Sequence, residues 1–196
     1  MKKRKTVETF LLFPVSFYII NAVKGGIKLY VKQLSKNEKI ALIQRFEKIK
    51  ELQEKGICFS CYNFSTGDIF PDEGLIFYED EKVRCQFEKY PRATGHTIIV
   101  AKEHYEDISE MPLELGVHIL KISDAIIKLH KEIIGAEKVY MCTICDGKRN
   151  HLHFQLFPRL KGETIGFGNF AREEGIIMDY HETVELYRYK LKGIIL

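Results

Sequence analysis

The pattern that most constrains the fold is a long series of regularly spaced apolar residues in the second half of the chain. They recur at alternating steps of four and three residues, at Leu115, Ile119, Ile122, Ile126, Leu129 and Ile133. This spacing places them on one face of an α-helix. Pro112 suits the first turn of such a helix, and Gly135 suits its end. We therefore predict a helix over about residues 112–134 whose apolar face must be covered by another element.

Short strand patterns lie on both sides of this helix. Strand patterns occur over residues 75–78, 83–87 and 97–100 before it, and over residues 138–144 and 151–157 after it. A second helix is predicted over about residues 180–192. Strands grouped before and after one long helix favour an α+β fold, in which a largely antiparallel sheet packs against that helix.

The N-terminal part has a different pattern. Ser35 and Glu38 form a capping box that predicts a helix over about residues 36–55. We assign residues 1–56 to an N-terminal extension, and residues 57–196 to the main domain with its C-terminal loop and helix. The apolar stretch Phe10–Val23 is shorter than the ~20 residues of a membrane span. Basic residues precede it as in a signal peptide, but no good cleavage pattern follows, so we expect it to be buried or covered by a partner.

Composition excludes several classes of protein. The chain is 45% hydrophobic and 29% charged, which is ordinary for a soluble globular protein and excludes a mainly disordered or collagen-like chain. A net charge of +3 gives no broad basic surface, so nucleic acid is disfavoured as a partner. The five cysteines are an odd number and do not suggest a disulfide framework, which fits a reducing cytoplasm. No membrane partner is expected.

The segment from Asn150 to Arg159 carries the candidate chemistry. In a strand, alternate side chains share a face, so His151, His153 and Gln155 line one side and apolar residues line the other. The two histidines lie roughly 6.6 Å apart along such a strand. A row of two imidazoles and a carboxamide has no evident role in folding. The alternative is a polar strand face in contact with water.

This row resembles the signature of the histidine triad (HIT) superfamily of nucleotide hydrolases and transferases, which is His-x-His-x-His. Gln155 in the third position is similar to the branches of galactose-1-phosphate uridylyltransferase and diadenosine polyphosphate phosphorylase. The upstream elements Gly95-His96 and Lys102-x-His104 follow the order of the family. The resemblance extends from about Cys58 to Arg159, roughly half of the chain, and implies a HIT-like α+β domain.

The resemblance also implies a mechanism. His153 would be the nucleophile that attacks the α-phosphate of a nucleotide ester or anhydride, such as a dinucleoside polyphosphate, and forms a covalent nucleotidyl-histidine. Gln155 would donate a hydrogen bond to a phosphate oxygen, but as an amide it cannot act as a general acid or base. The implied partner is a nucleotide substrate, and family members commonly form homodimers.

Two other functions stay open. One is a zinc-stabilised nucleotide-binding or regulatory protein with little turnover, which Gln155 and a shortened loop before the triad both suggest. The other is a HIT-type enzyme that processes nucleic-acid ends, which the slight basic excess does not favour.

The pair Cys58-x-x-Cys61 suits two small buried residues, a redox pair or half of a zinc site. The resemblance implies that His104 and His151 complete a structural zinc site with this pair. A second pair, Cys142-x-x-Cys145, lies in an apolar strand pattern and is interpreted as buried side chains.

The resemblance suggests residues for the nucleotide pocket. Glu88 matches the position that often holds ribose hydroxyls, and His96 matches a histidine near the triad. Lys148, Arg149 and Asn150 occupy the shortened loop and are candidates for phosphate binding, because cations and amides bind phosphate well. The alternatives are a solvated glutamate, a structural histidine and a plain surface turn.

Overall fold

The computed structural model describes residues 29–67 and 73–195, so the apolar stretch Phe10–Val23 lies outside the described residues. Its centre is a sheet of five strands in the order β2-β3-β4-β6-β5, in which every neighbouring pair is antiparallel. The strands are β2 Ile76–Glu79, β3 Val83–Phe87, β4 Thr97–Ala101, β5 Lys138–Cys142 and β6 His153–Arg159. The predicted α+β fold with an antiparallel sheet is confirmed.

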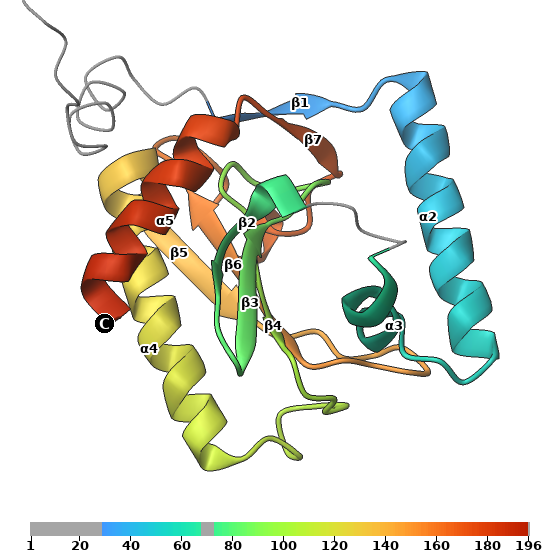
Figure 1. The fold of residues 1–196 in the computed structure, drawn as a ribbon. Helices are drawn as coiled ribbons and strands as arrows, with labels where there is room; N and C mark the ends of the chain where they lie inside the picture. Colours follow the sequence, from blue (N-terminus) through green and yellow to red (C-terminus); the bar gives the residue numbers. More distant parts are fainter. Residues whose placement is uncertain (1–28, 68–72, 196) are drawn as a thin grey trace, which may run out of the picture.

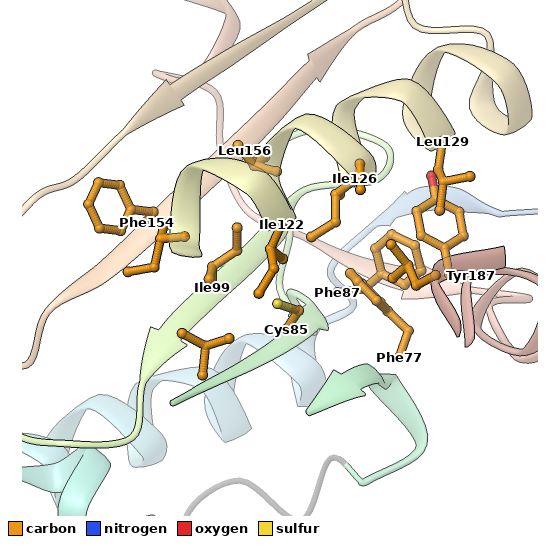
Figure 2. Close-up of a cluster of buried hydrophobic side chains, with 14 of the residues drawn as sticks. Phe77, Cys85, Phe87, Ile99, Ile122, Ile126, Leu129, Phe154, Leu156 and Tyr187 are labelled. Carbon is orange, nitrogen blue, oxygen red and sulfur yellow. The ribbon is translucent and has the colours of Figure 1, made fainter. Parts of the chain in front are cut away.

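One face of the sheet is covered by the two C-terminal helices (Figure 1). Helix α4 spans Leu113–Leu129 and continues through a π-helical turn at His130–Ile134, and α5 spans His181–Ile195. The predicted helix over residues 112–134 is thus confirmed, and it ends at Gly135 in a left-handed conformation. Its apolar face packs on the inward-facing side chains of the strands (Figure 2). This core includes Cys85, Phe87, Ile99, Ile122, Ile126, Phe154, Leu156 and Tyr187.

Helices α2 and α3 lie on the other side of the sheet (Figure 1). Helix α2 spans Lys36–Glu54, and both hydrogen bonds of the capping box at Ser35 and Glu38 are present. Helix α3, Phe59–Thr66, was not predicted. Its aromatic, Ser, Asn and Thr residues have modest helix propensity, and eight residues are too few to show an apolar period.

A small second sheet joins distant parts of the chain. Strand β1, Tyr30–Gln33, pairs antiparallel with β7, Gly175–Met178. A strand of the predicted N-terminal extension therefore pairs with one from the C-terminal part. The domain boundary after residue 56 stays a prediction. No helix within residues 29–67 and 73–195 is both long and apolar enough to cross a membrane.

The regular part of β6 begins at His153, two residues later than predicted. Before it, the Leu152 N–H donates to the Tyr105 carbonyl at 2.8 Å, outside the ladder of β6. His151 therefore lies ahead of the strand, and its imidazole meets the start of α3. The predicted single row of His151, His153 and Gln155 is split into two environments.

Candidate functional site

The sheet face opposite α4 carries the polar side chains of β6. His153 pairs with Val100 of β4, and Gln155 pairs with Ile98. Residues paired across antiparallel strands project to the same face. Phe154 and Leu156 are buried on the helix side. The alternation predicted from the sequence therefore holds from His153 onward and presents His153 and Gln155 away from the core.

The hydrogen bonds of His153 determine which ring nitrogen carries the proton. Its Nδ1 lies 2.9 Å from the carbonyl oxygen of His151. Because a carbonyl only accepts, Nδ1 must donate, and the lone pair of the neutral ring is on Nε2. The Gln155 Nε2 lies 3.3 Å from that atom and is placed to donate to it. The neutral form of His153 thus has its lone pair on Nε2, as a nucleophile requires.

Behind Gln155 lies a buried histidine. The His96 Nε2 is 3.0 Å from the Gln155 Oε1, and the imidazole stacks on the Phe157 ring with centroids 4.1 Å apart. His96 is only 4% exposed, and this burial lowers its pKa to about 3. The ring is therefore neutral at physiological pH.

A cavity of about 140 Å³ opens beside His153. It lies between α3 and the face of β3, β4 and β6, and Glu88 also lines it. Its walls are Phe59, Ser60, Asn63, Phe64, Arg84, Gln86, Glu88, Ile98, Val100 and His153. Aromatic and aliphatic walls with a few polar groups are typical of small-molecule sites.

Two charged residues of the cavity wall have partners within the fold. The Arg84 guanidinium lies 4.6 Å from the centre of the Phe64 ring and forms an ion pair with Glu79 at 3.0 Å. The Glu88 carboxylate accepts from the Tyr90 N–H at 3.1 Å. Arg84 and Gln86 were not identified from the sequence. Their alternation with buried Val83, Cys85 and Phe87 indicates that they share the outer face of β3.

Four candidate metal ligands converge at the start of α3. The donor atoms of Cys58, Cys61, His104 and His151 all lie within 4.8 Å of one another. The His151 Nδ1 is 3.3 Å from the Cys58 Sγ and 3.4 Å from the Cys61 Sγ, and the His104 Nδ1 is 3.5 Å from the Cys61 Sγ. A tetrahedral zinc ion with bonds of about 2.0–2.3 Å separates its ligand atoms by about 3.3–3.8 Å. The four residues therefore fit zinc.

The hydrogen bond of His151 and the burial of Cys61 affect how the cluster could bind a metal. The His151 Nε2 lies 2.6 Å from the Ala101 carbonyl and donates to it, which leaves Nδ1 free to bind a metal. Burial, followed by the neighbouring Cys58 sulfur, raises the pKa of the Cys61 thiol to about 11. Ionisation of this thiol at neutral pH therefore needs a positive ion beside it.

The turn before β6 is engaged with the protein itself. The Arg149 Nε donates to the Gly56 carbonyl at 3.1 Å, and its guanidinium pairs with Glu106 at 3.0 Å. The Asn150 Oδ1 accepts from the Gly147 N–H at 2.7 Å. Lys148 is exposed in the same turn. Their predicted roles in phosphate binding stay predictions. The Arg149 contact attaches the turn to the α2–α3 junction, and the Asn150 contact closes the turn on itself.

The remaining cysteines are separated by the sheet. Cys85 is fully buried in the core, as expected, and Cys145 packs against that core. Cys142 pairs with Gln155 and therefore shares the outer face of the sheet. The two residues of the pair Cys142-x-x-Cys145 thus lie on opposite sides, and they do not form a common ligand pair.

Two relatives are similar to about half of this chain. No protein-family model matches the chain. An uncharacterised HIT-like protein of Borreliella burgdorferi is 30% identical over 96 residues, which cover 46% of this chain and 69% of the relative. An uncharacterised HIT-like protein of Methanocaldococcus jannaschii is 31% identical over 99 residues, which cover 47% and 76%.

A solved structure has a similar fold. The crystal structure of a hypothetical histidine triad nucleotide-binding protein from Sulfolobus tokodaii aligns with a TM-score of 0.54 at 22% identity. The alignment covers 69% of this chain and 93% of that protein.

Proposed function

The chain belongs to the HIT-like family, and on that premise we propose that it is a nucleotide hydrolase or nucleotidyltransferase whose nucleophile is His153. The observation that carries the proposal is that the His151 carbonyl engages the Nδ1 of His153, a residue of the cavity wall, so that the lone pair of the neutral ring is on Nε2. The proposed reaction occurs at the α-phosphate of a nucleotide ester or anhydride, such as a dinucleoside polyphosphate.

The reaction has two displacements. In the first, the His153 Nε2 lone pair attacks the α-phosphorus, and the bond from phosphorus to the leaving group breaks with its electron pair on the leaving group. The imidazole then carries a positive charge, and its Nδ1–H bond to the His151 carbonyl stabilises that charge. In the second, water or a phosphate oxygen attacks the phosphorus, and the pair of the P–N bond returns to Nε2. When water attacks, its proton passes to solvent.

Gln155 limits the leaving groups that this chain can expel. Its amide can donate a hydrogen bond to a phosphate oxygen, but it cannot give a proton to the departing atom. The leaving group must therefore depart as a stable anion, which a phosphate or polyphosphate group does and an alkoxide or amide does not. We infer the transferase branches of the family, with phosphate or a sugar phosphate as acceptor, as the first choice and hydrolysis as the second.

The residues of the cavity wall suit the binding of a nucleoside beside His153. Its aromatic walls, Phe59 and Phe64, suit stacking on a base. The Glu88 carboxylate suits the two ribose hydroxyls, since a carboxylate can accept from both. The turn of Lys148, Arg149 and Asn150 is proposed to act on the phosphate side.

Cys58, Cys61, His104 and His151 would hold zinc. Four protein ligands complete a tetrahedral site, which is the arrangement of structural zinc. Such an ion supplies a cross-link between the start of α3 and the entry to β6. It would thereby position the His151 carbonyl that accepts from His153.

We also propose a homodimer. Three large apolar side chains lie at helical spacing on the outer face of α4: Leu113 is 78% exposed, Val117 46% and Leu120 60%. Apolar stripes of this kind commonly mark an interface.

The test is direct capture of the intermediate. The full-length protein is incubated with α-labelled dinucleoside polyphosphates and nucleoside diphosphosugars, quenched in alkali and digested to locate the label. We expect label on His153, none in His153→Ala, and full labelling in His181→Ala, which removes an exposed imidazole on α5. Repeating the reaction with and without added phosphate separates phosphorolysis from hydrolysis by the products.

The alternative is the zinc-stabilised nucleotide-binding protein with little turnover. It is favoured by the Gln155 amide, which occupies the His153 Nε2 in the resting site. Nucleotide binding without label or turnover across the panel would establish this function instead. Label that persists in His153→Ala would contradict the assigned nucleophile.

A further inference from the structure

We propose that His96 is a positioning residue that fixes the amide orientation of Gln155 and, through it, keeps the lone pair of His153 on Nε2. The proposal rests on the proposed role of His153 as nucleophile. It assigns His96 to the support of the nucleophile instead of contact with the nucleotide.

The carboxamide of Gln155 has two orientations with opposite consequences. It lies between two imidazoles, 3.0 Å from the His96 Nε2 and 3.3 Å from the His153 Nε2. Its oxygen only accepts and its NH₂ group only donates. Rotation of the amide by 180° leaves its shape unchanged and reverses both hydrogen bonds.

His96 selects one of the two orientations. Its Nδ1 lies 3.4 Å from the backbone nitrogen of Arg92, which donates, so Nδ1 is an acceptor. The buried ring is neutral and holds a single proton, which is therefore on Nε2. Nε2–H can only donate, and the amide must turn its oxygen toward it. The NH₂ group of Gln155 then faces His153.

The hydrogen bonds at His153 require the same orientation of the Gln155 amide. The His151 carbonyl requires Nδ1–H on His153, which places the lone pair on Nε2 where the Gln155 NH₂ donates. In the reversed orientation, the amide oxygen would face that lone pair. Relief of this repulsion needs a proton on Nε2, and a protonated Nε2 cannot attack phosphorus. The direction of all these bonds is thus set by the backbone groups of Arg92 and His151.

His96 itself is held from both faces of the sheet. Its ring is buried against Phe157, outside the walls of the cavity. Its neighbour Gly95 has a φ of +79°, and a Cβ there would lie 2.5 Å from the Ile134 side chain. On its other side, the Thr97 hydroxyl donates to the Gly95 carbonyl at 3.0 Å. A rigid, buried imidazole suits the role of a fixed donor.

Three variants separate this role from a structural one. His96→Phe keeps a ring against Phe157 and removes both hydrogen bonds. His96→Gln returns an N–H donor at the distance of Nε2. Gln155→Leu removes the amide through which His96 acts. Each is made in the full chain and compared with the unmodified protein.

The measurements are the single-turnover rate of His153 labelling, the nucleotide Kd, and the tautomer of His153 from ¹⁵N NMR. We expect His96→Phe to lower the labelling rate by roughly 10²-fold or more, as in other sites that lose control of a catalytic tautomer. We expect an unchanged Kd and a new population of His153 protonated on Nε2. His96→Gln should recover the rate. In the Gln155→Leu background, His96→Phe should have no further effect.

An unchanged labelling rate in folded His96→Phe would overturn the proposal, and so would an equal loss of rate in the Gln155→Leu background. If His96→Phe does not fold, His96→Asn replaces it, because its shorter amide keeps the acceptor for Arg92 and does not reach Gln155. If the proposed function itself is wrong, the unmodified protein will not be labelled, which distinguishes that outcome from the others.

Discussion

The buried imidazole of His130 makes the stability of the fold depend on pH in a calculable way. The side chain is 0% exposed. Its Nε2 lies 3.2 Å from the Thr97 hydroxyl, which already donates to Gly95, so Nε2–H is the donor. Its Nδ1, 2.7 Å from the Tyr187 hydroxyl, is then the acceptor. A second proton on this ring would reverse the hydrogen bond with Tyr187, and burial lowers the pKa of His130 to about 3.

The sign and size of the effect follow from linkage. The unfolded chain has a His130 pKa of about 6.5, so below this pH it binds more protons than the native state, and stability falls as pH falls. Between pH 7 and pH 5 the loss from this one residue is about 2 kcal/mol. The loss would continue down to the native pKa near 3. The figure depends little on that native value, because pH 5 lies above it.

The assay compares urea unfolding of the unmodified protein and His130→Gln at pH 7 and pH 5. Gln is neutral at both values, so the difference in unfolding free energy between the two proteins should change by about 2 kcal/mol in favour of the variant. Effects of acid on the metal ligands and carboxylates cancel in this difference. His181→Gln, at an exposed position, should show almost no such change. Parallel pH profiles for His130→Gln and the unmodified protein would refute a neutral, buried His130.

Three further outcomes are expected. Gly95→Ala should lower the unfolding free energy by about 1–3 kcal/mol, measured by denaturation, because its Cβ would lie 2.5 Å from Ile134 at a positive φ; no loss would contradict the close approach. Metal analysis should give about one zinc per chain, with most of it lost in Cys58→Ser and none lost in Cys85→Ser; zinc retained by the first variant would contradict the ligand set. Leu120→Lys should shift the mass in light scattering from dimer to monomer, and a monomeric unmodified protein would contradict the dimer.

The elements predicted correctly from the sequence are those in which one pattern decides the structure. Strand β3 was predicted over its full range because Val83, Cys85 and Phe87 alternate with polar residues. The length of α4 followed from its apolar stripe and from Gly135 at its end. In both elements, apolar residues recur with the period of the strand or helix, so the local sequence is enough to predict the element.

Other elements depend on partners that are distant in the sequence. Strand β7 was not predicted because its four residues become a strand by pairing with β1, about 145 residues earlier along the chain. Helix α3 was missed for lack of a period, although it supplies Phe59, Asn63 and Phe64 to the cavity. The metal cluster was expected only from family resemblance, since the spacing of the Cys58–Cys61 pair alone fits three kinds of site.

The donor and acceptor roles in the hydrogen bonds of the site could not be predicted from the sequence. The triad pattern identifies His153 and Gln155, but it does not say which end of an amide faces which ring. That direction depends on the Arg92 N–H and the His151 carbonyl. These are backbone groups, which residue types do not distinguish. It becomes visible only when the fold places both groups at the ends of one hydrogen-bonded chain.

The segment Gly95–Thr97 connects the two faces of the sheet. His96 contacts Gln155 on the outer face, while Thr97 contacts His130 on the helix side. Because His96 and Thr97 are adjacent in the backbone and contact opposite faces, we expect a change in the buried network to displace the backbone that carries His96. A variant such as Gly95→Ala should therefore lower both the rate of His153 labelling and the free energy of unfolding, although Gly95 and His153 are not in contact. Loss of stability with an unchanged labelling rate would show that the two faces act independently.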